Sequence, residues 1–335
     1  MKMTRSEKKF EIWKEADVLV VGGGPAGVGA AVSAARQGKK VLLLEKRGFL
    51  GGNITACYVE NCNYFLRGTQ FSAEGLYAEI EAGCYEEFGN DNTREKNRKA
   101  FHSEYLKIYL DRLMKKNGVE VLFHSFVNEV IMDGQKIAAV LISARMIVDA
   151  TGDADVAFSA GVPFEQGREK DGMCQPGTVN FRVTGVHREE MEQFEGDRLT
   201  QVSHIFTEES RAGRTGLSCS KQDIPFGRVT GAGQISYVNY SCAHGIDPTD
   251  VEGLSRGEME CREYILELYH YLKRQFPEMR DIEITSIAPE IGFRDSRRIK
   301  GKYCVTIDDL ESGKQFEDVI AVFPRFYDML SPDGI

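Results

Sequence analysis

The sequence predicts an α/β protein with a parallel sheet, a β-hairpin excursion and an inserted α+β cap domain. A short apolar run over 17–21 leads into a glycine-rich turn, a helix of small residues and a second apolar run over 40–44. This succession is typical of a strand–helix–strand unit, because two parallel strands need a crossover segment between them. The length of 335 residues leaves room for a second lobe.

Each further element of the first lobe has its own local signal. Apolar residues at helical spacing, ended by Asn117-Gly118, predict a helix. An Asp133-Gly134 turn between two apolar runs predicts a β-hairpin. The other elements expected here are a polar loop over 91–100, a third strand over 119–123, hairpin strands over 127–132 and 136–142, and a buried strand over 146–150.

Composition divides the rest of the chain. It changes after about Gly167, and the segment up to about Asp281 mixes strands with helices. Its longest helix is expected to begin at a capping box formed by Thr249 and Glu252. We therefore expect a first domain over 1–166, a cap or substrate domain over 167–281, and a return towards the first domain over 282–335.

The charge balance excludes several classes of partner. The formal net charge is −9, so we expect no surface for nucleic acid or for an anionic membrane, since phosphate groups attract clustered positive charge. The N-terminal residues are charged and lack the apolar core of a secretory leader. The 8 cysteines contain no C-x-x-C pair. They favour reduced thiols, a cytoplasmic location and no bound metal.

The glycine-rich turn has the pattern of a dinucleotide-binding loop. Residues 22–27 read Gly-Gly-Gly-Pro-Ala-Gly and match G-x-G-x-x-G after a strand and before a helix. The first glycine makes the tight turn, the second lets backbone N–H groups approach a pyrophosphate, and the third packs helix on strand. Glu45, at the end of the next strand, can accept hydrogen bonds from the ribose hydroxyls. These features predict a Rossmann-like nucleotide-binding domain.

Longer motifs carry a more specific resemblance. After Glu45, the sequence Lys-Arg-Gly-Phe-Leu-Gly-Gly-Asn over 46–53 is similar to the stretch that follows the acidic residue in FAD enzymes. Residues 147–157 resemble the Ala-Thr-Gly motif of two-dinucleotide-binding flavoproteins, and residues 292–299 add a further match. Over most of residues 16–321, the chain resembles a bacterial family of FAD-dependent oxidoreductases that is distantly related to fumarate-reductase and heterodisulfide-reductase A flavoproteins.

That resemblance implies non-covalent FAD and a redox activity. The residues expected to bind FAD are Gly22, Gly24, Pro25, Ala26, Gly27, Glu45, Lys46, Gly51, Gly52, Asn53, Val127, Ala150, Thr151, Gly152 and Asp153. Of these, Val127 would place its backbone against the adenine. Against the family pattern, the sequence ends before a C-terminal segment that supplies the last pyrophosphate and flavin contacts. A truncated, non-catalytic flavin-binding protein is therefore one alternative.

Basic side chains indicate how a substrate would be bound. Arg294, Arg297 and Arg298 lie close together after a glycine, and guanidinium groups suit a substrate carboxylate. In fumarate-reductase relatives an arginine also acts as an acid. The alternative for each arginine of this chain is a structural salt bridge between the cap and the FAD-binding domain. His244 follows a cap strand and is an acid–base candidate. We expect Arg294, Arg297 and His244 to be catalytic, in hydride transfer between a small anionic organic substrate and flavin N5. The electron donor or acceptor is not identified by the sequence.

A second chemistry would use two cysteines. Cys57 and Cys62 form C-x4-C soon after Gly51-Gly52, and flavin disulfide reductases place a redox pair almost immediately after the same glycines. Here Cys57 comes three residues later than in those enzymes, and the sequence has no second G-x-G-x-x-G for NADPH. A dithiol/disulfide flavoprotein is therefore an alternative function, and ordinary thiols in a pocket wall are the alternative to it.

Overall fold

The computed structural model of the chain describes residues 12–62, 74–88, 99–133, 136–139, 142–227, 229–230, 232–320 and 331–333. The chain divides into two compact units, of which unit 1 comprises residues 1–51 and 110–164 and unit 2 comprises residues 52–109 and 165–335. The domain boundaries expected after 166 and 281 stay a prediction. Most of the expected polar loop over 91–100 lies outside the described residues.

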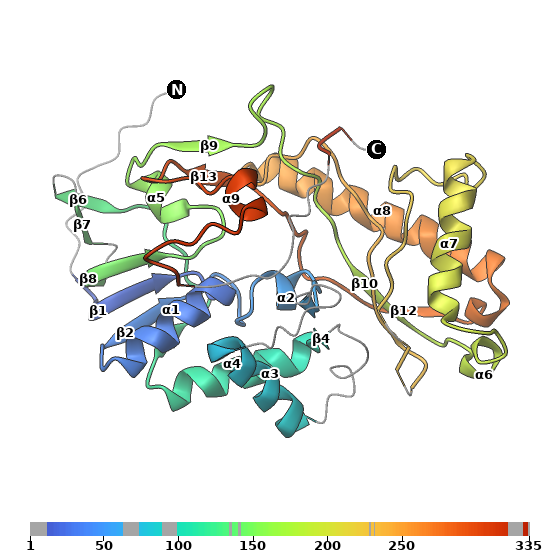
Figure 1. Cartoon of the computed structure of the whole chain (residues 1–335), viewed down its shortest axis with the longest axis horizontal. Coiled ribbons are helices and arrows are strands. Elements are labelled where there is room, and N and C mark those ends of the chain that lie inside the picture. Colours follow the sequence, from blue (N-terminus) through green and yellow to red (C-terminus); the bar gives the residue numbers. More distant parts are fainter. Residues whose placement is uncertain are drawn as a thin grey trace. The chain divides into compact units, whose positions relative to one another are not determined.

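Unit 1 contains the parallel sheet (Figure 1). Its strands are, in sheet order, β5 (Glu120–Leu122), β2 (Val41–Leu44), β1 (Lys14–Val21) and β8 (Ile142–Asp149). Each neighbouring pair is parallel, and α1 (Pro25–Arg36) connects β1 to β2 and packs against both. All four residues of β2 are buried, as expected for a strand covered on both faces. The predicted α/β fold with a parallel sheet is confirmed.

The first strand of the hairpin in unit 1 begins at Ile131, four residues later than predicted. The strands β6 (Ile131–Asp133) and β7 (Lys136–Ala139) pair antiparallel on either side of the expected turn. The expected second hairpin strand ended at Ile142, but β8 begins there and pairs with β1 from Lys14 onwards. Because β8 pairs along the whole of β1, it begins four residues before the predicted start at 146. The short helix α5 (Asp155–Ser159) follows β8.

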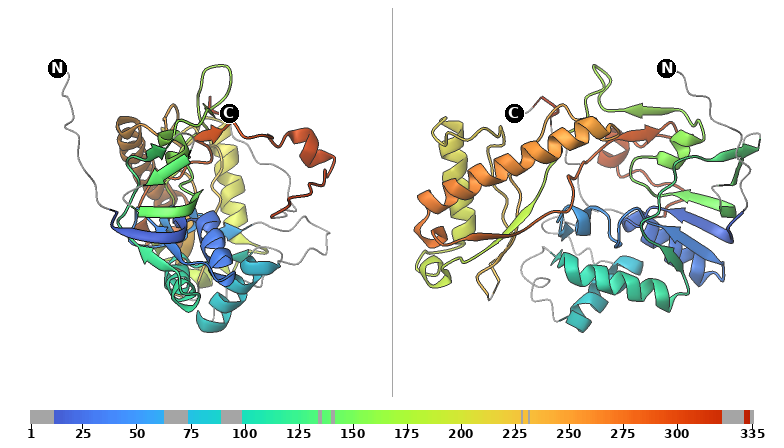
Figure 2. Two further views of the ribbon diagram at one scale, coloured as in Figure 1. Left: turned by 90° about the vertical axis from the view of Figure 1, so that its left-hand side faces the viewer. Right: turned by 180° about the vertical axis from the view of Figure 1, so that it is seen from behind.

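Unit 2 is built on an antiparallel sheet with two helices beside it (Figure 2). Its sheet has the order β11 (Ile235–Val238), β10 (Phe181–Thr184) and β12 (Glu283–Ile287). The helices are α7 (Arg198–Arg211) and α8 (Val251–Gln275). The rings of Phe206 and Tyr271 join them edge to face at 5.5 Å between centroids. The stripe of α8 that is buried comprises Gly257, Cys261, Ile265, Leu268 and Leu272, which has the spacing of one helix face.

Further helices and strands lie among the described residues. They are α2 (Asn53–Ala56), β3 (Asn61–Cys62), α3 (Gly75–Phe88), β4 (Lys99–Ala100), α4 (Ser103–Lys116), β9 (Phe164–Gln166), α6 (Arg188–Met191), η2 (Pro277–Met279), β13 (Arg297–Ile299) and α9 (Ile307–Glu311). None of the helices among the described residues is both long enough and apolar enough to span a bilayer.

The capping box predicted for α8 is wrong by one residue. The N-cap is Asp250, whose Oδ2 accepts a hydrogen bond from the Gly253 amide at 2.7 Å. Thr249 instead donates both its amide and its hydroxyl to Oδ1 of Asp247, at 2.8 and 2.7 Å. Thr249 is therefore engaged in the turn before the helix. Asp250, the next residue with a side-chain acceptor, caps α8 instead.

Candidate functional site

The glycine loop after β1 leaves no space for side chains at two positions. Gly22 has φ of +100°, a conformation that disfavours other residues, and a Cβ there would overlap the backbone of Ala150. A Cβ on Gly27 would overlap the carbonyl oxygen of Gly22. The loop, α1 and the end of β8 are therefore in direct backbone contact, which is the role that the third glycine of the motif was predicted to have.

The N-terminal end of α1 has the properties of an anion site. Its N-cap is Gly24, which makes no side-chain capping hydrogen bond, and its first turn contains no acidic residue. Pro25 takes the first helical position, where its missing N–H costs nothing, and Pro25 and Ala26 are exposed. The positive end of this 12-residue helix is accordingly open to a phosphate group.

Glu45 is buried behind the loop at the end of β2. Its Oε2 accepts a hydrogen bond from the Gly23 amide at 2.7 Å, and its Oε1 accepts one from the Arg47 amide at 2.8 Å. The residue is only 2% exposed. The carboxylate therefore fixes the loop onto β2, a role that the sequence reasoning did not foresee. Oε1 also accepts a hydrogen bond from the Arg47 guanidinium at 3.4 Å. Oε2 has a second lone pair, so the predicted contact with a ribose hydroxyl stays chemically open at that oxygen.

The turn after β8 is held by a residue that the sequence analysis did not single out. Oδ1 of Asp149 accepts from the amide and hydroxyl of Thr151, at 3.2 and 2.7 Å, and Oδ2 accepts from the Ala157 amide at 2.9 Å. The Asp155 amide donates back to the Thr151 hydroxyl at 3.0 Å. These bonds fix the Ala-Thr-Gly turn beside the glycine loop, where Ala150 donates its amide to Val21 at 2.8 Å.

The other predicted FAD contacts are distributed over both units. Gly51 donates its amide to the Gly23 carbonyl at 2.9 Å, Lys46 is exposed beside Glu45, and Val127 packs against the core of unit 1. In the turn after Thr151, Gly152 is exposed and Asp153 is half-buried.

In unit 2, Gly52 is the N-cap of α2 with φ of +55°, and Asn53 donates to the Phe293 carbonyl at 3.3 Å. Unit 1 thus brings together the loop, Glu45, Gly51 and Ala150 at the carboxyl ends of its strands.

Two of the predicted catalytic residues come from neighbouring segments of unit 2. Residues 177 and 178 lie between two other segments, because Gly177 pairs with Ala243 and Thr178 pairs with Gly292. His244 directly follows the first of these pairs, and Arg294 comes two residues after the second. Two isolated antiparallel bridges therefore join residues 177 and 178 to the segments that carry the histidine and the arginine.

The hydrogen bonds of His244 define its tautomer. Its Nδ1 lies 3.1 Å from the Pro332 carbonyl oxygen, which can only accept, so Nδ1 carries the proton. Its Nε2 lies 2.9 Å from the Ser220 hydroxyl and 3.5 Å from the Cys242 sulfur. In the neutral ring Nε2 is then the acceptor, and these contacts hold the ring in a fixed orientation.

The other two arginines of the cluster have different surroundings. Arg298 donates to the Gly167 carbonyl at 2.6 Å and lies 3.4 Å from an Asp295 oxygen, so it holds two segments of unit 2 together. Arg297, in β13, is half-buried and interacts electrostatically with Asp247. Its catalytic role stays a prediction.

The cysteine pair of the alternative chemistry does not lie on one helix. Cys57 is buried at the end of α2, with its sulfur 3.5 Å from Oδ1 of Asn53. Tyr58 then takes φ of +53°, which ends the helical path. The side chain of Cys62 lies outside the part of the chain that the structure describes. Within that part, no group of three or more His, Cys, Asp or Glu side chains is arranged to hold a metal ion.

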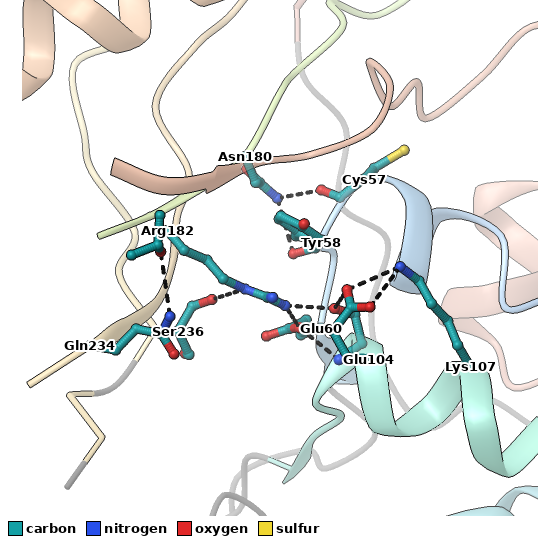
Figure 3. Close-up of polar contacts among 11 residues, drawn as sticks. Cys57, Tyr58, Glu60, Glu104, Lys107, Asn180, Arg182, Gln234 and Ser236 are labelled. Carbon is teal, nitrogen blue, oxygen red and sulfur yellow. Dashed lines mark hydrogen bonds and ion pairs between the residues drawn. The ribbon is translucent and has the colours of Figure 1, made fainter. Parts of the chain in front are cut away.

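A buried ion pair supports the segment that follows Cys57 (Figure 3). The side-chain amide of Asn180 donates hydrogen bonds to the carbonyls of Cys57 and Tyr58, at 3.0 and 3.2 Å. Arg182 forms an ion pair with Glu60, and its guanidinium lies 4.0 Å from the centre of the Tyr58 ring. Both charged side chains are almost fully buried, at 7% and 2% exposure. Asn180, just before β10, and Arg182, within β10, therefore hold the backbone at Tyr58 in its unusual conformation.

Further hydrogen bonds connect the pair to neighbouring segments. Glu60 also accepts from the Ser103 amide at 2.8 Å, and Arg182 donates to the Ser236 carbonyl at 2.9 Å. Burial raises the pKa of Glu60, while Arg182 and Ser103 act in the opposite direction. No local sequence pattern indicates this network, because its members are separated by 43 to 122 positions.

Comparisons with known proteins give one family match and several partial relatives. A protein-family model described as "FAD dependent oxidoreductase" matches residues 17–335. Dihydrolipoyl dehydrogenase of Acholeplasma laidlawii is 31% identical over 152 residues, which are 43% of this chain and 42% of that protein. Dihydrolipoyl dehydrogenase of Bacillus subtilis (strain 168) is 35% identical over 112 residues, 31% of this chain and 23% of that protein. The chain thus spans less than half the length of these relatives.

Among solved structures, the chain is similar to glycine oxidase from Geobacillus kaustophilus. It is 11% identical, the superposition covers 86% of this chain and 84% of that chain, and the TM-score is 0.49.

Proposed function

Because the chain belongs to the FAD dependent oxidoreductase family, we propose that it transfers a hydride between a small organic acid and N5 of FAD. The cofactor is FAD, and the chain is an oxidoreductase. The proposal adds the class of substrate and the residues that act on it. FAD supplies the hydride chemistry when bound, and the chain supplies binding, orientation and proton transfer.

The residues of unit 1 fit the adenine nucleotide part of FAD. The open end of α1 suits the pyrophosphate, and the overlap expected for any Cβ at Gly22 or Gly27 marks a backbone cradle. Asp149 fixes the Ala-Thr-Gly turn next to that cradle. On this proposal Glu45 retains its bonds to the two amides and accepts a ribose hydroxyl through the second lone pair of Oε2.

The placement of Arg294 and His244 carries the proposal for the substrate. The two bridges at residues 177 and 178 join both of their segments to the same short stretch of chain. Arg294 is exposed, and a guanidinium binds a carboxylate through two parallel hydrogen bonds. His244 presents Nε2 as an acceptor, with its orientation fixed by Pro332. It would take a proton from the substrate in oxidation, or return one in reduction.

Anaerobic bleaching of the FAD-loaded protein tests this function. We expect at least one member of a panel of 2-hydroxy, 2-amino and unsaturated carboxylic acids to change the flavin absorbance, in whichever redox state is required. The matching amides and methyl esters should be inactive, because they lack the charge that Arg294 would bind. Equal rates with acids and amides would contradict the proposal.

Two variants then separate the candidate chemistries. His244→Gln removes the basic nitrogen and should lower the bleaching rate by about 10²- to 10⁴-fold. Cys57→Ser should leave the rate unchanged within about twofold, since organic-acid oxidation does not use the thiol. If Cys57→Ser abolished turnover and His244→Gln did not, the dithiol alternative would replace the present proposal.

A further inference from the structure

The segment over 331–333 contacts the proposed acid–base histidine of unit 2. The carbonyl oxygen of Pro332 lies 3.1 Å from Nδ1 of His244. On the other side of the ring, Nε2 lies 2.9 Å from the Ser220 hydroxyl and 3.5 Å from the Cys242 sulfur. A hydroxyl or a thiol can donate or accept and so selects no tautomer, whereas a carbonyl can only accept and places the proton on Nδ1. The position of the Pro332 carbonyl therefore decides which ring nitrogen is the acceptor.

An ion pair anchors the residue that follows Pro332. The carboxylate of Asp333 accepts hydrogen bonds from Nη1 and Nη2 of Arg168, both at 2.6 Å. The two side chains are 58% and 27% exposed. Most ion pairs at such exposure contribute little, but a carboxylate held by both prongs of a guanidinium is the exception, because its two parallel bonds are strong and directional. Since the Pro332 carbonyl belongs to the peptide bond before Asp333, the pair restricts where that carbonyl can lie.

Arg168 is itself held from the opposite edge of its guanidinium. Its Nε and Nη2 donate to the carboxylate of Asp171 at 2.8 and 2.7 Å. The turn that carries it, after β9, is closed by backbone bonds from the Arg168 amide to the Met173 carbonyl at 3.0 Å and from the Gly172 amide to the Arg168 carbonyl at 2.8 Å. Hydrogen bonds from Arg168 lower the pKa of Asp171 to about 2 and also lower the pKa of Asp333. Both carboxylates are therefore charged at physiological pH.

We propose that Arg168 and Asp333 are positioning residues for His244, an inference that rests on the proposed function. Their ion pair holds the Pro332 carbonyl at Nδ1, and the carbonyl in turn keeps Nε2 of the neutral ring as the proton acceptor. Loss of the pair releases the carbonyl and makes both tautomers accessible. A ring with its proton on Nε2 cannot take a proton from the substrate through that nitrogen. Neither positioning residue touches the substrate in this arrangement.

Nuclear magnetic resonance tests the contact without turnover. Long-range proton–nitrogen spectra of the isotope-labelled chain, with and without FAD, distinguish the two tautomers at about pH 9, where a histidine ring is neutral. His244→Gln identifies the signals of His244 among those of the 6 histidines. We expect the wild-type ring to carry its proton on Nδ1 and Asp333→Ala to give a mixture of both tautomers.

Asp171→Ala is the matched control. It removes the other carboxylate from the same guanidinium but leaves both bonds between Arg168 and Asp333 and the backbone bonds of the turn. Its His244 signals should match those of the wild type, and Asp333→Glu should restore the wild-type tautomer at least in part. Thermal unfolding checks that each variant is folded. In turnover, Asp333→Ala should lower kcat about tenfold and change KM less than about twofold, because it misaligns the proton acceptor and leaves substrate binding intact.

The possible outcomes separate the positioning contact from the function. A wild-type ring protonated on Nε2 overturns the proposal, as does a folded Asp333→Ala variant whose His244 signals are unchanged. An equal change in Asp171→Ala and Asp333→Ala overturns the assignment to Asp333. If the tautomers respond as expected but no organic acid changes the flavin, the positioning contact stands and the proposed redox function fails. If organic acids bleach the flavin while Asp333→Ala alters neither tautomer nor kcat, the function stands and the positioning role fails.

Discussion

Replacing Gly27 with alanine is expected to abolish FAD retention and to destabilise unit 1. The new Cβ would overlap the carbonyl oxygen of Gly22 and contact the Ala150 side chain at 3.4 Å. Both neighbours belong to the cradle, so relief of the overlap must move α1 away from β1 or open the turn. Overpacking of this kind costs about 1–3 kcal/mol or more. Flavin absorbance after desalting and urea unfolding of the variant measure the two effects.

Gly29→Ala is the matched control in the same helix. No atom lies within 4 Å of a Cβ at this position, and alanine is favoured over glycine in a helix by about 0.5–1 kcal/mol. The control should therefore retain FAD and be slightly more stable than the wild type. Equal behaviour of the two variants would show that the contact between α1 and the glycine loop does not shape the cofactor site.

The second large effect is expected at the buried ion pair of unit 2. Arg182→Met removes the counter-ion of Glu60, which is 2% exposed, and the loss of one partner of such a pair costs about 3–5 kcal/mol. It also removes the cation over the Tyr58 ring and the bond to the Ser236 carbonyl. The decrease should appear as a lower midpoint in urea unfolding followed by far-ultraviolet circular dichroism.

Two comparisons assign this effect to the buried charge. Arg262→Met removes an ion pair between Arg262 and Glu258 on α8, where the arginine is 46% exposed, and should cost less than about 1 kcal/mol. Adding Glu60→Gln to Arg182→Met should restore part of the lost stability, because no carboxylate is then left without a partner. If the two single arginine variants were equally stable, the network of Figure 3 would not support the fold.

Local patterns were sufficient for part of the fold. The glycine loop, the apolar run of β2 and the crossover helix occupy consecutive residues, so their spacing alone predicts a parallel sheet and a nucleotide turn. The errors were local too. Asp250 replaced Thr249 as the cap of α8 because Asp247 had already engaged the threonine, and β8 began four residues early because β1 pairs along its whole length.

Contacts between distant residues could not be predicted in this way. Asp149 was part of a quoted motif, yet only the structure shows that its carboxylate organises the turn. Likewise, the partnership of Glu60 with Arg182 joins residues 122 positions apart. A single acidic or basic residue in a sequence gives no indication of such a partner.

The visible spectrum of the purified 335-residue chain, before and after incubation with excess FAD and desalting, is the decisive test of the cofactor site. We expect flavin absorbance to persist through desalting at a near-stoichiometric level, and Gly27→Ala to lose it while Gly29→Ala does not. A wild-type chain that is folded but colourless after the same treatment would contradict the claim that these residues form an FAD site.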